Sequence, residues 1–184
     1  MIIAEGTFAG LAGEEIELFR KLIGGAEGEA VEIGCLDGWS TAHILECSRY
    51  RLTTIDPFIP DSMAANLIGS EERFRKNIEP WKDRVTLLRD YSYNVVVGWN
   101  RMLDFLFLDG DHQYPSVLRD FEQWTPLIKP GGILAMHDSR MGRAGGANFH
   151  MGPSQVAREY VYGKPHFWQI IGEAFSLTIA RKSP

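Results

Sequence analysis

The chain has 184 residues, of which 45% are hydrophobic and 23% are charged, as in an ordinary globular protein with a full apolar core. Its net charge of −5 disfavours nucleic-acid and anionic membrane partners, and no apolar run is long enough to span a membrane. Cys35 and Cys47 are too few for a disulfide framework, and no signal peptide is recognisable. We therefore expect a cytoplasmic protein whose residues 1–184 form one domain.

Short apolar runs alternate with helical stripes along most of the chain. The runs predict buried strands over residues 30–33, 52–55, 85–88, 103–108 and 133–136. Helical spacing of apolar residues predicts helices over residues 11–23, 42–47, 70–78, 92–99, 114–124 and 156–161. Such alternation is typical of a parallel sheet whose crossover connections are right-handed.

The C-terminal segment follows another pattern. Residues 166–171 and 175–180 predict two strands, and Gly172-Glu173 predicts a tight turn between them. Strands that are joined by such a turn are antiparallel neighbours. The expected fold class is therefore α/β, with a Rossmann-like, doubly wound, mostly parallel sheet and a C-terminal antiparallel hairpin.

Residues 31–45, VEIGCLDGWSTAHIL, predict a ligand-binding turn between a strand and a helix. Gly34 and Gly38 allow the backbone to turn sharply and to approach a ligand closely. The helix that follows points its first N–H groups at the turn and so favours an anion. The spacing is G-x-x-x-G and lacks the dinucleotide pattern G-x-G-x-x-G, which argues against pyrophosphate binding. The alternative is an ordinary turn without a ligand.

Polar residues near this turn are candidates for contacts with a nucleoside. Glu32 is a carboxylate at the end of a buried strand, and it needs a polar partner from the protein or from a ligand. Ser40 or Thr41 is expected to cap the helix. Asp56 ends the second strand about 20 residues after the turn, where an acid accepts hydrogen bonds from ribose hydroxyls in doubly wound folds. The alternative for Asp56 is a turn cap.

Acids and a histidine end the fourth and fifth predicted strands. Asp109 follows the fourth strand, and His137 and Asp138 follow the fifth. Neighbouring strands lie about 5 Å apart, and their carboxyl ends form the rim where α/β sheets bind ligands. Asp109 and Asp138 are therefore expected to converge on one divalent cation beside His137. Carboxylates suit Mg²⁺, whereas an imidazole ligand shifts the preference toward Mn²⁺, Fe²⁺ or Zn²⁺. The alternative is that both carboxylates only cap the following segments.

Taken together, these motifs resemble those of class I S-adenosylmethionine-dependent methyltransferases. The first is E-x-G-x-x-x-G-x-S at residues 32–40. The motifs D-G-D-H-x-Y at residues 109–114 and L-x-K-P-G-G-x-x-x-x-H-D at residues 127–138 resemble the small-molecule O-methyltransferases of methyltransferase family 24. Relatives of that type include sugar O-methyltransferases of macrolide and cephalosporin-type biosynthesis and, more distantly, the catechol type.

The resemblance implies a class I methyltransferase fold with S-adenosylmethionine as the methyl donor. It places the loop with Tyr91 and Ser92 along the adenine of that cofactor. In metal-dependent relatives, residues matching Asp109, His137 and Asp138 hold the metal, which would be Mg²⁺ or Mn²⁺ here. This sequence departs from the family at His137, where the relatives usually carry Glu or Asp.

The resemblance also assigns a role to His112, since a matching histidine is the general base in some relatives. A hydroxyl that attacks a methyl sulfonium must lose its proton, and an imidazole that is neutral near pH 7 suits this task. We therefore name His112 and Asp109 as the catalytic candidates and expect a pH dependence near the reference imidazole pKa of about 6.5. The alternative for His112 is a helix cap.

Residues 139–152 form a long glycine-rich segment, which is a candidate lid, with Arg140, Arg143 and His150 as candidate contacts for an anionic acceptor. A surface loop without a role is the alternative.

The predicted function is O-methylation of a hydroxyl on a sugar or other small metabolite, with no nucleic-acid or membrane partner. One rival is a catalytically silent nucleoside-binding or interaction protein on the same fold. A second is an NAD-dependent oxidoreductase, which the missing G-x-G-x-x-G motif disfavours. The sequence identifies neither the methyl acceptor nor the oligomeric state, and a homo-oligomer is one of the open outcomes.

Overall fold

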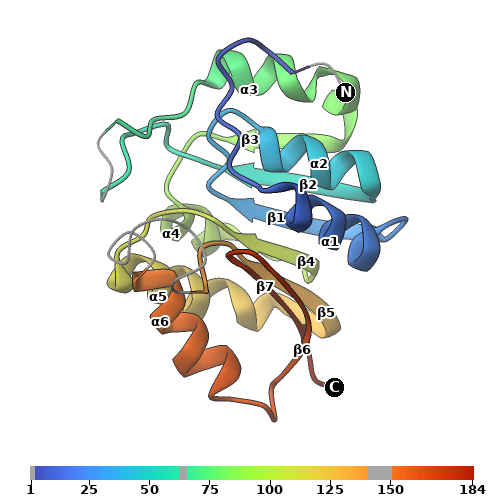
Figure 1. The fold of residues 1–184 in the computed structure, drawn as a ribbon, viewed down its shortest axis with the longest axis vertical. Helices are drawn as coiled ribbons and strands as arrows, with labels where there is room; N and C mark the ends of the chain where they lie inside the picture. Colours follow the sequence, from blue (N-terminus) through green and yellow to red (C-terminus); the bar gives the residue numbers. More distant parts are fainter. Residues whose placement is uncertain (1–2, 63–65, 141–150) are drawn as a thin grey trace.

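The computed structural model of the chain describes residues 3–62, 66–140 and 151–184, which form a sheet with helices on both faces (Figure 1). The strands are β1 (Glu27–Ile33), β2 (Arg49–Ile55), β3 (Val85–Leu88), β4 (Leu103–Leu108), β5 (Ile128–Met136), β6 (Trp168–Ala174) and β7 (Leu177–Lys182). The α-helices are α1 (Gly13–Ile23), α2 (Trp39–Cys47), α3 (Glu71–Ile78), α4 (Ser92–Val95), α5 (Tyr114–Trp124) and α6 (Met151–Val156). Short 3-10 helices, η1 (Glu79–Arg84), η2 (Val96–Gly98) and η3 (Thr125–Leu127), follow α3, α4 and α5, and a π-helical stretch, η4 (Ala157–Tyr162), continues α6.

The strand order brings the predicted site residues to one edge of the sheet. The order is β3-β2-β1-β4-β5-β7-β6, in which β1 to β5 are parallel and β7 is antiparallel to both β5 and β6. Ile33 pairs with Ile55 on one side and with Leu108 on the other, and Leu108 pairs with Met136. The residues that follow these strands therefore start at the same level. The predicted doubly wound fold with a C-terminal antiparallel hairpin is confirmed.

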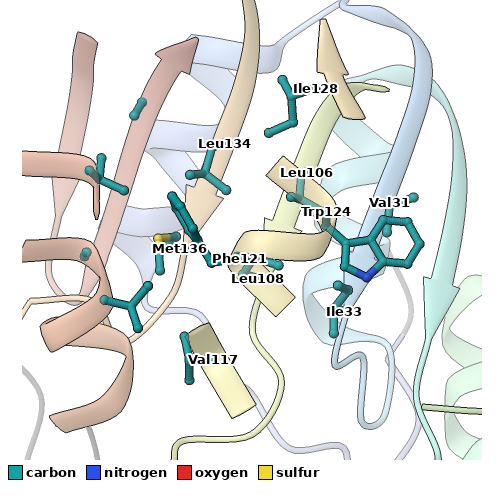
Figure 2. Packing of buried hydrophobic residues seen from close by; sticks show 14 of the residues in the cluster. Val31, Ile33, Leu106, Leu108, Val117, Phe121, Trp124, Ile128, Leu134 and Met136 are labelled. Atoms are coloured by element: carbon teal, nitrogen blue, oxygen red, sulfur yellow. The ribbon is translucent and has the colours of Figure 1, made fainter. Parts of the chain in front are cut away.

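Two layers of helices cover the sheet. Helices α1 and α2 lie on one face, and α4, α5 and α6 lie on the other (Figure 1). Val117, Phe121 and Trp124 recur at helical spacing on α5 and pack against side chains of β1, β4 and β5 (Figure 2). Each large apolar side chain buried in this way contributes about 1.5–3 kcal/mol. Among the described helices, none has the length and apolarity that crossing a membrane requires.

The turn of the C-terminal hairpin differs from the prediction. It lies at Phe175 and Ser176, and Phe175 has a φ of +43°, so the turn predicted at Gly172-Glu173 is wrong. Gly172 lies inside β6, where a Cβ atom would come within 2.7 Å of Leu22 and 2.8 Å of Leu18. This glycine therefore allows α1 to pack closely on the strand, a role that its position in the sequence does not distinguish from a turn.

Strand β5 is also longer than predicted. It begins at Ile128 and runs through Pro130, Gly131 and Gly132, which the sequence suggested as the entry to the strand. The pairing of β5 with β4 is irregular in this region, between Leu103 and Phe105. Irregular pairing accommodates a proline and glycines that a regular ladder would exclude.

Candidate active site

A cavity of about 630 Å³ opens at the carboxyl ends of the parallel strands. Of the predicted site residues, the cavity is lined by Gly34, Asp56, Tyr91, Ser92, Asp109, His112, His137 and Asp138. Three others that the structure describes, Glu32, Gly38 and Ser40, are not part of this lining. The switch point of a doubly wound sheet is the expected place for a ligand in such a fold.

The glycine turn after β1 has the backbone geometry that the sequence predicts. Gly34 has a φ of +83°, and a Cβ atom there would lie 2.0 Å from the carbonyl oxygen of Asp109. Gly38 has a φ of +79° and occupies the N-cap position of α2. Both positions favour glycine because side chains rarely adopt this conformation, and only glycine fits against the chain at Asp109.

Glu32 finds its polar partner in the protein. Its side chain is fully buried, and it accepts hydrogen bonds of 2.5 Å from the hydroxyls of Ser40 and Thr41. The helix cap predicted for Ser40 or Thr41 is therefore wrong, because Gly38 takes the cap position and both hydroxyls point at the strand. Glu32 and Ser40 therefore affect a bound cofactor only indirectly, because their hydrogen bond holds α2 against β1. Burial raises the pKa of Glu32 to about 8, although the two hydroxyl hydrogen bonds oppose this rise.

We expect Glu32→Gln to remove a pH dependence of stability. Between the ordinary pKa of 4.5 and the folded value of about 8, folded Glu32 keeps a proton that the unfolded chain releases. The free energy of unfolding therefore falls as pH rises through this window, by at most about 1.4 kcal/mol per pH unit, and levels off above it. Urea unfolding of both proteins across the window measures the slope. Glu122→Gln, at an exposed position, is the control, and an unchanged slope in Glu32→Gln would contradict the assignment.

Asp56 braces the glycine turn. One of its carboxylate oxygens accepts hydrogen bonds from the backbone N–H groups of Cys35 and Leu36, at 2.9 and 2.8 Å, and the other accepts from Phe58 at 2.7 Å. A carboxylate offers about four acceptor sites, and three of them are taken by these backbone N–H groups. Asp56 lines the cavity, and this position is compatible with both the predicted ribose contact and the capping alternative.

The loop with Tyr91 and Ser92, which was predicted to lie along the adenine, contacts the buried carboxylate of Asp120. The Ser92 hydroxyl donates a hydrogen bond to Asp120 of α5, and Tyr91 stacks on Tyr93 with ring centroids 5.0 Å apart. Burial raises the pKa of Asp120 to about 6, against the opposing effect of the Ser92 hydrogen bond. The sequence analysis missed Asp120. The available signal was a carboxylate on the apolar face of a predicted helix.

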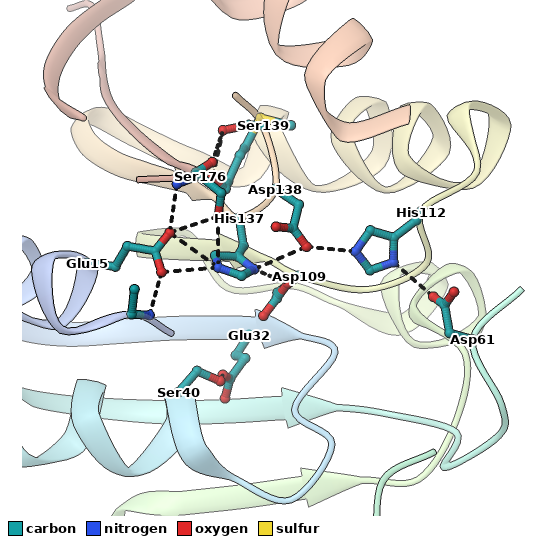
Figure 3. Close-up of polar contacts among 12 residues, drawn as sticks. Glu15, Glu32, Ser40, Asp61, Asp109, His112, His137, Asp138, Ser139 and Ser176 are labelled. Atoms are coloured by element: carbon teal, nitrogen blue, oxygen red, sulfur yellow. Dashed lines mark hydrogen bonds and ion pairs between the residues drawn. The ribbon is translucent and has the colours of Figure 1, made fainter. Parts of the chain in front are cut away.

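The candidate metal ligands converge as the strand order predicts (Figure 3). Nδ1 of His137 lies 3.0 Å from Oδ1 of Asp109 and 3.4 Å from Oδ2 of Asp138. One ligand atom from each of the three residues lies within 4.8 Å of the others. The donor set and its spacing therefore fit a divalent cation, and the metal itself stays a prediction.

On its other side, His137 meets Glu15, a residue that the sequence analysis missed. Nε2 of His137 lies 3.4 Å from a Glu15 carboxylate oxygen and 3.1 Å from the Ser176 hydroxyl. Glu15 has no exposed surface, and it accepts hydrogen bonds from the backbone N–H groups of Ala12 and Ser176. A signal was present, since Glu15 shares the buried face of α1 with Ile16, Phe19 and Ile23.

His112 lies between two carboxylates. Its Nδ1 is 2.9 Å from Asp61, which the sequence analysis also missed, and its Nε2 is 2.9 Å from Asp138 (Figure 3). Burial disfavours the imidazolium, but the hydrogen bonds to Asp138 and Asp61, together with the charges of Asp109 and Asp138, raise the pKa of His112 to about 9. The prediction of an imidazole that is neutral near pH 7 is therefore wrong for this arrangement. The residue nevertheless lines the predicted cavity.

Arg140 does not line the cavity. Its guanidinium lies 3.4 Å from Glu173 and 3.4 Å from the carbonyl oxygen of Phe175, both in the C-terminal hairpin. The other candidates for an anionic acceptor, Arg143 and His150, lie outside the described residues, as does most of the candidate lid.

Known proteins resemble this chain in sequence and in fold. A family model described as a methyltransferase domain, methyltransferase family 24, matches residues 31–139. An uncharacterized protein of Acanthamoeba polyphaga mimivirus is 29% identical over 117 residues, which cover 59% of this chain and 50% of that protein. The chain thus spans about half the length of this curated relative.

Solved structures share the fold. An O-methyltransferase from Bacillus cereus in complex with SAH superposes with a TM-score of 0.66 at 18% identity, covering 97% of this chain and 84% of that chain. The O-methyltransferase NovP superposes with a TM-score of 0.67 at 17% identity, covering 93% and 80%. Because the family model extends over more than half of the residues and includes the glycine turn and both acidic motifs, the chain belongs to methyltransferase family 24.

Proposed function

We propose that the chain is an S-adenosylmethionine-dependent O-methyltransferase that acts on a hydroxyl of an uncharged small metabolite, such as a sugar. The observation that carries this proposal is the single cavity in which Gly34, Asp56, His112 and Asp138 meet. These residues supply a place for the methyl donor and a place for an acceptor within one space. The family membership supports the choice of methyl donor.

The donor side of the proposed site is the glycine turn with Asp56. Gly34 and Leu36 of this turn line the cavity, and the bare backbone at Gly34 is the proposed contact for the methionine part of the donor. Asp56 is the proposed acceptor for the ribose hydroxyls. Tyr91 and Ser92 line the cavity from the loop after β3, where the adenine is proposed to lie.

The acceptor side carries the acid–base chemistry. As the acceptor oxygen bonds to the methyl carbon, the methyl–sulfur bond breaks and its electrons stay on sulfur, and the hydroxyl proton must leave. His112 is the proposed base; to take up that proton it must be neutral, with the acceptor hydroxyl in place of Asp138 at Nε2. Asp61 and Asp138 hold its ring at 2.9 Å from either side and so fix its orientation.

Asp109, His137 and Asp138 are the proposed holders of a divalent cation, since their donor set and spacing fit one. When bound, such an ion lowers the pKa of a hydroxyl that contacts it. The imidazole ligand favours Mn²⁺ over Mg²⁺.

The charge of the cavity supports an uncharged acceptor. Acidic residues that line it are Asp56, Asp61, Asp109, Asp111, Asp120 and Asp138. Arg119 lines it as well, and its guanidinium lies over the Tyr93 ring at 4.2 Å. Before a donor or metal binds, these six carboxylates outnumber Arg119 and the two lining histidines even when both imidazoles are protonated, which disfavours the anionic substrate considered from the sequence.

Calorimetric titration of the protein with S-adenosylhomocysteine and with NAD tests the proposed function directly. Binding of S-adenosylhomocysteine without binding of NAD is the expected result. A methyl-transfer screen with sugars and other hydroxyl metabolites then separates an enzyme from a silent binding protein on the same fold. Tight NAD binding without a response to S-adenosylhomocysteine would overturn the proposal.

Substitution of Asp56 by alanine should weaken cofactor binding by about ten- to a hundredfold, since a hydrogen bond to a charged group contributes about 1.5–3 kcal/mol. Titration with S-adenosylhomocysteine measures the change. Asp83→Ala, at an exposed position on η1, is the control. Circular dichroism verifies that the variant is folded, because Asp56 also braces the turn. Unchanged affinity in a folded variant would assign Asp56 to the structural role alone.

Chelation should abolish most of the methyl-transfer activity, and Mn²⁺ or Mg²⁺ should restore it. The reason is that Asp109 and Asp138 place their carboxylates within reach of one ion. The rate is measured after dialysis against a chelator and again after each ion is added back. Full activity after exhaustive chelation would exclude metal assistance and leave His112 as the proposed means of deprotonation.

A further inference from the structure

We propose that Glu15 is a positioning residue that, with Ser176, fixes the tautomer of His137 so that Nδ1 faces Asp109 and Asp138 as a metal ligand. This inference rests on the divalent cation of the proposed function. Glu15 lies on α1, outside the segment that the family model matches.

The surroundings of Nε2 determine which ring nitrogen carries the proton. The hydroxyl of Ser176 donates its one proton to Glu15 at 2.8 Å, so its oxygen can only accept from Nε2 of His137, which lies at 3.1 Å. Glu15 receives hydrogen bonds from the backbone N–H groups of Ala12 and Ser176 as well, so it acts as an acceptor. Nε2 faces oxygens that accept, and it must therefore be the N–H nitrogen.

The surroundings of Nδ1 then require a positive charge. Nδ1 lies 3.0 Å from Asp109, a hydrogen-bond distance, and 3.4 Å from Asp138. Without a metal, a second ring proton on Nδ1 supplies this charge and is donated to Asp109. A bound cation takes the place of that proton and leaves the Nε2 proton with Glu15 and Ser176. A histidine that binds a metal commonly donates its other N–H to a carboxylate, which fixes the tautomer and the ring orientation. Glu15 is placed to be that carboxylate.

His137 and the two residues that contact its Nε2, Glu15 and Ser176, come from three separate parts of the chain. Glu15 belongs to the first turn of α1, Ser176 to the turn between β6 and β7, and His137 to the end of β5. Glu15 and Ser176 are buried, at 0% and 1% exposure, and His137 is 8% exposed. Because all three are held by packed elements, the ring of His137 has little freedom to flip.

The same contacts explain why a histidine suits position 137 here. A carboxylate at this position would face Glu15 without a donor between them. The imidazole of His137 separates the negative charge of Glu15 from that of Asp109. Glu15 and His137 therefore function as a pair.

Titration calorimetry with Mn²⁺ on the protein saturated with S-adenosylhomocysteine tests this proposal. Glu15→Gln should weaken Mn²⁺ binding by about ten- to a hundredfold, the usual effect of losing such a supporting group. Glu14→Gln, the exposed neighbour on the same helix, is the matched control and should bind Mn²⁺ as the native protein does. Nitrogen-15 NMR of labelled histidine, with Zn²⁺ as the diamagnetic ion, should show the proton of His137 on Nε2 in the native protein and a loss of this preference in Glu15→Gln.

A double variant separates positioning from general destabilisation. In a His137→Asp background there is no N–H to orient, so adding Glu15→Gln should not weaken Mn²⁺ binding further. If Glu15→Gln does not fold, Ser176→Ala supplies the test, since it removes one acceptor of Nε2 and should weaken the tautomer preference in the same spectra.

The outcomes distinguish this inference from the proposed function. If the native protein binds no divalent ion, the metal part of the proposed function fails and the inference fails with it. If the native protein binds Mn²⁺ and Glu15→Gln binds it equally well with Nε2 still protonated, the inference alone is overturned.

Discussion

Replacement of His112 by alanine should slow methyl transfer by about a hundred- to ten-thousandfold, which is the usual contribution of a positioned base. Binding of S-adenosylhomocysteine should be unchanged, because the proposed donor side consists of the glycine turn and Asp56, whose contacts do not involve His112. Single-turnover rates and calorimetry measure the two effects separately. His166→Ala, at an exposed position between η4 and β6, is the control for loss of a histidine.

The pH profile of the same variants tests the role of His112 as a base. Burial lowers the pKa of His112, but the hydrogen bonds to Asp138 and Asp61 and the charges of Asp109 and Asp138 together raise it to about 9. Only the neutral imidazole accepts a proton, so the native single-turnover rate should rise as pH increases toward this value. His112→Ala should lose this rise. A variant that keeps the rise and most of the rate would return His112 to a structural role.

Substitution of Gly34 by alanine should destabilise the protein by about 2–6 kcal/mol, from the combined costs of a strained φ and of overpacking. Gly34 has a φ of +83°, and the added Cβ would lie 2.0 Å from the carbonyl oxygen of Asp109. Thermal unfolding should show this as a fall in Tm of roughly 5–20 °C for a domain of this size. The two strand ends must separate to admit the methyl group, so cofactor affinity should fall as well.

Gly25→Ala is the matched control for Gly34→Ala. Gly25 has a φ of +74°, but a Cβ atom there meets nothing within 4 Å, so only the strain of the backbone applies. The difference in Tm between the two variants isolates the contact with Asp109. Equal losses of stability in both would contradict a close approach at Gly34.

Most of the sheet could be predicted because local signals determine it. The strands Val85–Leu88 and Leu103–Leu108 have the predicted bounds, since short apolar runs with sharp polar borders are unambiguous. The hairpin turn could not be placed in the same way. Gly172 resembles a turn residue in the sequence, but its real role is to admit α1, which depends on packing between segments far apart in the chain.

The site residues likewise fall into those that topology predicts and those that depend on contacts between distant segments. The convergence of Asp109, His137 and Asp138 follows from strand order alone, so topology was sufficient to predict it. Glu15 is 122 residues away from His137, and no periodic pattern connects the two. Asp61 lies in an irregular segment, so its pairing with His112 could not be predicted either. The pKa of His112 depends on these distant partners, which is why the reference value of about 6.5 was misleading.

The contact between Gly34 and the backbone of Asp109 has a consequence for how the proposed active site can change its acceptor. Because no side chain separates the two strand ends, the proposed donor turn and the acid at the proposed acceptor side are in direct backbone contact. A substitution at Gly34 or at Asp109 would therefore disturb the proposed donor side and the proposed acceptor side together. We therefore expect new acceptor preferences to evolve through residues that do not share this contact, such as Ile59 and Pro60 in the segment after β2 and Phe175 in the hairpin turn, all of which line the cavity. Selection experiments that broaden the acceptor range should accumulate their substitutions there.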